Sequence, residues 1–178
     1  AGCLQQLERV GGTSAGAIQA CLLAVGYTTA ELQAVLEATS FRKFNDGGFM
    51  AVPGALRLSK KMGWYRGEAL TQWIESLIAA KTGNADITFQ QLYEQRYQRG
   101  KLALYITATD LSWQQLRVFS HETYPHMRVA DAVRISASIP FYFQPLWIDS
   151  AGHTFASNDS LFSRVLVVDG GLLSNYPL

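Results

Sequence analysis

The sequence has only two cysteines and no long apolar run, and both absences restrict what the protein can be. Cys3 and Cys21 cannot form a disulfide framework, so the redox compartment stays open. No apolar run approaches about 18 residues, which argues against a transmembrane helix, and no signal peptide is visible. The net charge of +1 gives no sign of nucleic-acid binding. We therefore expect a soluble or peripheral membrane protein, with the cytoplasm slightly favoured as its compartment and the oligomeric state left open.

Metal and cofactor patterns are missing as well. The three histidines, two cysteines and scattered acids do not have the spacing of metal ligands. No glycine loop follows a Walker or dinucleotide-binding pattern. We therefore expect neither a metal site nor a cofactor.

The residues that are present favour a single α/β domain. A chain of 178 residues that is 48% hydrophobic can bury one sizeable core. Strand-like and helix-like segments alternate, which is typical of an α/β fold with a mainly parallel sheet. The predicted strands lie at residues 9–11, 102–108, 115–120, 141–148 and 165–168, the last as a buried parallel strand, and the main helices at 2–7, 15–25, 68–81, 88–100 and 129–137.

A G-x-S-x-G pattern at Gly12-Thr-Ser-Ala-Gly16 lies between the first strand and a helix that is apolar nearly all round. Glycine on both sides of Ser14 permits a tight, strained turn that exposes the serine hydroxyl. The unpaired N–H groups at the helix start, that of Ala15 among them, and the helix dipole favour negative charge at the same point. The turn thus offers a nucleophile and part of an oxyanion site, although the pattern also arises by chance and in phosphate-binding loops.

A serine nucleophile needs a base, and the sequence offers two candidates. Asp169 ends the apolar strand 165–168 and is followed by Gly170 and Gly171, which leave room beside its carboxylate. A Ser14–Asp110–His153 triad also fits the order of residues in α/β-hydrolases. However, His153 and the other histidines lie in loop-like stretches, so we favour Asp169.

These two motifs resemble those of the patatin-like phospholipase family, whose members share a Ser–Asp dyad. Gly12-Thr-Ser-Ala-Gly16 is similar to the nucleophile motif of the family, and Asp169-Gly-Gly171 to its base motif. The resemblance covers nearly the whole chain and includes Thr107-Ala-Thr-Asp110-Leu, Ala130-Asp-Ala-Val133 and Ser136-Ala-Ser-Ile-Pro140-Phe.

The resemblance implies a three-layer patatin-like fold, in which a central, mainly parallel sheet is flanked by helices. It implies a serine carboxylic-ester hydrolase of the phospholipase A or lysophospholipase type, with Ser14 as nucleophile, Asp169 as base and an acyl-enzyme intermediate. Members carry a Gly-rich oxyanion loop before the first helix. We expect that loop upstream of Ala1, with residues 1–178 forming one domain truncated at both ends. A catalytically silent module that binds lipid or a protein partner is the alternative from another class.

Residues 39–66 differ from the rest of the chain. They mix aromatic residues and glycines with six basic residues and one acidic residue, giving a net charge of +5. Such a composition is typical of a flap that contacts an anionic lipid surface, although an irregular loop with buried aromatics has the same composition. We expect residues 41–66 to be mobile and to meet the surface of a phospholipid or other acyl-ester lipid substrate.

Overall fold

The computed structural model describes residues 7–46, 62–99, 102–157 and 163–173. Residues 2–6 of the predicted helix 2–7 and residues 47–61 of segment 41–66 lie outside these ranges. The elements in chain order are β1 (Arg9–Gly12), α1 (Ala15–Ala24), α2 (Thr29–Ala38), the 3₁₀ helix η2 (Phe41–Phe44), β2 (Gly63–Tyr65), α4 (Glu68–Thr82), α5 (Phe89–Glu94), α6 (Arg96–Arg99), β3 (Ala103–Asp110), β4 (Gln115–Phe119), α7 (Val129–Ser136), β5 (Phe141–Phe143), β6 (Leu146–Ile148), β7 (Thr154–Phe155), β8 (Val165–Asp169) and the 3₁₀ helix η3 (Gly170–Leu172).

The central sheet has the strand order β1-β3-β8-β6-β7, with β4 also paired to β3. Within the described residues β1 and β3 are parallel, whereas β4 and β8 run antiparallel to β3, and β6 antiparallel to β8. β2 and β5 form a separate parallel pair. The expectation that residues 165–168 form a parallel strand is therefore wrong, because β8 is antiparallel to both of its neighbours. Its uniformly apolar sequence reflects burial on both faces, which either direction of pairing can produce.

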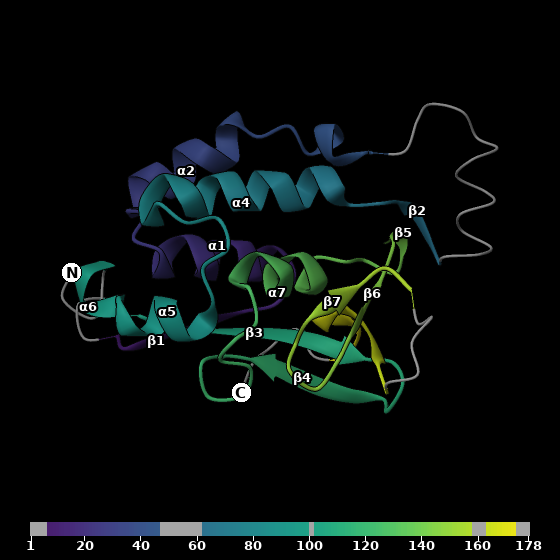
Figure 1. Ribbon diagram of the computed structural model, residues 1–178. Coiled ribbons are helices and arrows are strands. Elements are labelled where there is room, and N and C mark those ends of the chain that lie inside the picture. Colours follow the sequence, from purple (N-terminus) through teal and green to yellow (C-terminus); the bar gives the residue numbers. More distant parts are fainter. Residues whose placement is uncertain (1–6, 47–61, 100–101, 158–162, 174–178) are drawn as a thin grey trace.

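The sheet and the helices are stacked in layers, as expected for this α/β class. α1 packs on β1 and β3, and α7 packs on β3 and β8, so these two helices cover the centre of the sheet. α4 packs on α7 and α1, and α2 packs on α1, forming a further tier above them (Figure 1). The inner helices thus lie between the sheet and an outer pair of helices.

Helix α1 is buried nearly all round, as its apolar sequence predicts. Ala17, Ala20, Cys21 and Ala24 are each at most 2% exposed. Burial raises the pKa of the Cys21 thiol to about 12, so this cysteine is a core residue rather than a reactive one. Gly26, with φ of 101°, ends the helix as expected.

The ends of other elements follow their local signals, with two exceptions. Thr28 and Thr88 form capping boxes with Glu31 and Gln91. The predicted helix 88–100 is interrupted at Gln95, between α5 and α6. The predicted strand 141–148 is likewise divided into β5, which pairs with β2, and β6, which joins the central sheet.

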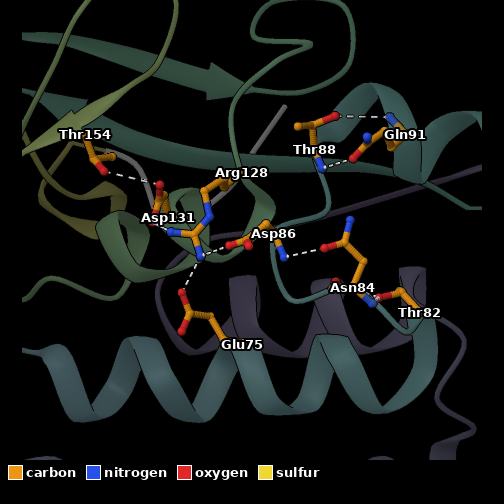
Figure 2. A network of polar contacts seen from close by, with 9 residues as sticks. All are labelled: Glu75, Thr82, Asn84, Asp86, Thr88, Gln91, Arg128, Asp131 and Thr154. Carbon is orange, nitrogen blue, oxygen red and sulfur yellow. Dashed lines mark hydrogen bonds and ion pairs between the residues drawn. The ribbon is translucent and has the colours of Figure 1, made fainter.

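Helix α7 is held by a network of charges around Arg128 (Figure 2). The guanidinium of Arg128 forms ion pairs with Glu75 of α4, with Asp86 at 2.6 Å and with Asp131 at 3.2 Å. Thr154 of β7 donates a further hydrogen bond to Asp131 at 3.2 Å. Burial raises the pKa of the Asp131 carboxyl. The network connects α4, α7 and β7 and so fixes the helix that leads to Ser136.

Candidate active site

Ser14 occupies the tight turn between β1 and α1. Its backbone has φ of 54° and ψ of −123°, a positive-φ conformation that a non-glycine residue adopts only when its surroundings impose it. Gly12 is essential for the turn, because a Cβ there would lie 2.1 Å from the carbonyl oxygen of Gly16. A Cβ on Gly16 itself would meet nothing within 4 Å. The expected steric need for glycine is therefore confirmed before Ser14 and is wrong after it.

Asp169 is the last residue of β8 and is 6% exposed. Its Oδ1 accepts a hydrogen bond from the Gly171 N–H at 2.8 Å, and its own N–H donates to the Ser138 carbonyl at 3.0 Å. Gly170 lies so close to β3 that a Cβ would approach the Thr107 carbonyl oxygen to 2.7 Å. The two glycines thus let the chain leave β8 sharply and hold the carboxylate in one orientation.

The structure brings Ser14 and Asp169 together. The Ser14 hydroxyl donates to Asp169 Oδ2 at 2.6 Å, which is within the reach that a nucleophile and its base require. The two residues do not meet at a shared carboxyl edge of parallel strands, because β1 is parallel to β3 and β8 is antiparallel to it. Gly12 is opposite Ile106 and Asp169 is opposite Ala108 on strand β3, with which both β1 and β8 pair. Strands β1 and β8 run in opposite directions along β3, and their ends lie within two residues of each other.

The alternative triad is not assembled. Asp110 is fully buried and is paired with Arg117 at 2.7 Å. The Nδ1 atom of the exposed His153 lies 2.9 Å from Asp149 Oδ2. The structure thus gives Asp110 and His153 separate partners, and places Asp169 where the triad needs a histidine.

The N–H of Ala15, the residue after Ser14, is the candidate oxyanion donor. It begins α1 and takes part in none of the hydrogen bonds between described residues, whereas the N–H of Gly16 donates to Thr13 O at 2.8 Å. An unpaired N–H at a helix start is suited to bind an oxyanion. Among the described residues no three His, Cys, Asp or Glu side chains gather as metal ligands would.

Two serines that sequence reasoning did not assign to the site support it. The Ser136 hydroxyl accepts the Ser14 N–H at 3.0 Å, and Ser138 accepts the Asp169 N–H. Arg134, 2% exposed, donates to the carbonyls of Gly67 (3.1 Å) and Gln144 (3.1 Å) and contacts the Ser138 hydroxyl. Burial lowers the pKa of this guanidinium to about 10. The only signal in the sequence was the resemblance of segment 136–140 to a family segment.

An apolar cavity of about 270 Å³ opens beside Ser14. Its walls come from α1, η2, α4, β5 and the segment between α7 and β5. In segment 41–66, residues 47–61 lie outside the described ranges, but Phe44 is buried, contacts the Trp73 ring at 5.1 Å between centroids and lines the cavity. No helix in the described part of the chain has the length and hydrophobicity needed to cross a membrane.

The chain is similar to several known proteins. The model of the Patatin family, described as patatin-like phospholipase, matches residues 1–178. The uncharacterised protein YqhO of Bacillus subtilis is 33% identical over an alignment of 183 positions, which covers 97% of this chain and 56% of that protein. A protein of invertebrate iridescent virus 6 named "Probable lipid hydrolase 463L" is 25% identical over 94% of this chain and 50% of its own length.

The solved structures agree in fold. VipD from Legionella pneumophila superposes with a TM-score of 0.62 at 18% identity, over 99% of this chain and 42% of that one. ExoU of Pseudomonas aeruginosa, in its complex with SpcU, gives a TM-score of 0.53 at 21% identity, over 78% and 34% of the two chains. The chain spans about half the length of the curated relatives it matches.

Proposed function

Because this chain belongs to the patatin-like phospholipase family, we propose that it hydrolyses acyl esters of lipids, with Ser14 as the nucleophile and Asp169 as the general base. The observation that carries the proposal is the 2.6 Å hydrogen bond from the Ser14 hydroxyl to the buried Asp169 carboxylate, at a strained strand-to-helix turn. A nucleophile and a base within hydrogen-bond reach are the minimum that acyl transfer requires.

The proposed reaction has two steps. Asp169 accepts the hydroxyl proton while Ser14 Oγ attacks the ester carbonyl, and the Ala15 N–H stabilises the oxyanion. The intermediate collapses, the alcohol or lysolipid leaves with the proton from Asp169, and the acyl group stays on Ser14. A water molecule then attacks the acyl-enzyme, giving its proton to Asp169, and the fatty acid is released as Oγ regains a proton.

Two observations support a lipid as the substrate. The cavity next to Ser14 is lined mainly by apolar side chains, which suits a hydrocarbon chain better than a sugar or peptide. The viral relative is named as a probable lipid hydrolase. We extend the proposal to a phospholipid or another acyl-ester lipid, with residues 41–66 at the lipid surface; in its support, Phe44 of this segment lines the cavity.

The test compares full-length protein carrying Ser14→Ala or Ser76→Ala with the unaltered protein. Ser76 is an exposed serine of α4 whose hydroxyl donates to the Trp73 carbonyl at 2.7 Å, so it controls for loss of any serine. A fluorophosphonate should label the unaltered and Ser76→Ala proteins but not Ser14→Ala, and hydrolysis of p-nitrophenyl butyrate should follow the same pattern. Labelling of Ser14→Ala at the unaltered rate would refute the assignment of the nucleophile.

A further inference from the structure

The cavity beside Ser14 has a direction, which follows from the exposure of its walls. Ile139 and Tyr142 are 52% and 41% exposed and form the mouth together with Ser14. Leu70 and Phe44 are each 3% exposed and form the inner end. A chain that enters past Ser14 therefore runs from solvent into the core, between α1 and α4.

The described residues of the inner walls offer no charged side chain to a ligand. Ile18, Phe44, Leu70 and Phe143 are hydrocarbon throughout. The hydroxyl of Tyr142, at the mouth, is already hydrogen-bonded to Asn45 Oδ1 at 2.5 Å. A polar head group would lose its hydration here without replacement, so the end of the substrate that enters this cavity is the acyl chain.

The volume limits how much of that chain fits. An apolar cavity of about 150 Å³ holds one benzene ring of six carbons, so 270 Å³ holds about ten carbons at the same density. We propose that this cavity is the acyl subsite and that it takes about ten carbons of a saturated chain, ending at Leu70 and Phe44. The assignment of this cavity to an acyl chain rests on the proposed function, whereas the limit of about ten carbons rests on the volume of the cavity.

The first experiment measures kcat/KM of the full-length protein on p-nitrophenyl esters of two to sixteen carbons, dispersed in mixed micelles of one non-ionic detergent. Each added methylene should raise kcat/KM about fourfold while it is buried, up to about ten carbons. Beyond that length kcat/KM should stay level, because further carbons remain outside the cavity.

Substitutions at Leu70 should move this limit in both directions. Leu70→Ala removes three carbons from the inner end and should extend the rise by about three carbons. Leu70→Phe adds three carbons and should shorten it by about three. Ile74→Ala is the matched control, since Ile74 lies one turn further along α4, is also 3% exposed, and lines a different cavity. It removes three carbons from the core and should leave the limit unchanged.

A second experiment separates this inference from the proposed function. Binding of hexanoate, decanoate and hexadecanoate to the Ser14→Ala protein is measured by calorimetry below their micelle concentrations. Decanoate should bind more than tenfold tighter than hexanoate, and hexadecanoate about as tightly as decanoate. If no ester is hydrolysed but this order is found, the function is wrong and the subsite stands. Hydrolysis that rises steadily to sixteen carbons, or that does not respond to Leu70→Ala, overturns the subsite and leaves the function intact.

Discussion

Replacing Asp169 by asparagine changes the chemistry of the proposed base while keeping its shape. The asparagine oxygen can still accept the Gly171 N–H, now bonded to Oδ1 at 2.8 Å. Its amide nitrogen then lies where Oδ2 accepts the Ser14 hydroxyl at 2.6 Å, and it can only donate. The hydroxyl proton loses its acceptor, so the serine is no longer activated. A general base contributes about 10²–10⁴ in rate, and we expect kcat/KM to fall by about 10³.

The cost in stability should be much smaller than the loss of activity. Hydrogen bonds to a charged group contribute about 1 kcal/mol more than neutral ones, so neutralising an acceptor of two bonds costs about 2 kcal/mol. For a domain of this size that lowers Tm by about 4–8 °C. Thermal unfolding of Asp169→Asn, recorded with the kinetics, should therefore show a folded protein at the assay temperature.

Asp110→Asn provides the matched control for this experiment. Asp110 is also a buried carboxylate at the end of a strand, and its register partner Val167 lies two residues from Asp169. Its pairing with Arg117 at 2.7 Å makes it at least as important for stability. We expect Asp110→Asn to lower Tm but to keep kcat/KM within a factor of three at temperatures where it is folded. The reasoning fails if Asp169→Asn keeps more than a tenth of the activity, because another group then accepts the proton.

Three further predictions concern the serine that binds the Ser14 backbone, the exposed histidine of the alternative triad, and the basic segment 41–66. Ser136→Ala leaves the Ser14 N–H without its acceptor at 3.0 Å. Because an unpaired group costs about 1–3 kcal/mol, this change should slow fluorophosphonate labelling of Ser14 about tenfold. Ser136→Thr should restore labelling, and a failure to do so would count against a hydrogen-bonding role of Ser136. His153→Ala should leave ester hydrolysis unchanged in a kinetic assay, since this exposed side chain pairs with Asp149. The double variant Lys60→Glu, Lys61→Glu should bind anionic vesicles more weakly at low salt, by about 1 kcal/mol or more of binding free energy per charge. Binding is measured by sedimentation with the vesicles, and an unchanged value would refute a membrane role for this segment.

The two turns of the candidate site were predictable because each is encoded locally. Gly12 precedes the serine since any side chain would collide with the Gly16 carbonyl, and Gly170 follows the aspartate since any side chain would collide with β3. Such close approaches leave glycines at fixed offsets from a functional side chain, which a sequence motif records. The layered α/β arrangement could also be predicted from the sequence, because hydrophobic residues recur with different periods in buried strands and in amphipathic helices.

The direction of β8 could not be predicted from the sequence in the same way. Val165–Val168 is apolar because β8 lies between β3 and β6 and packs under α7. Burial on both faces determines that composition, whereas direction depends on which distant strands pair with it. The sequence contains no local residue that records this choice. The correct meeting of Ser14 and Asp169 was thus reached from an incorrect picture of the strands.

The spacing of the pair depends on a segment that carries no conspicuous motif. Ser136, the last residue of α7, binds the backbone of Ser14, and Ser138 binds the backbone of Asp169, so two residues at the end of this helix hold both turns. Arg134 fixes that segment from within the core, through the carbonyls around Gly67 and through the Ser138 hydroxyl. An arginine in an amphipathic helix ordinarily indicates a solvent-exposed face, which is why this role could not be inferred from sequence. The sheet brings the two turns to the same level, but the end of α7 sets the distance between them.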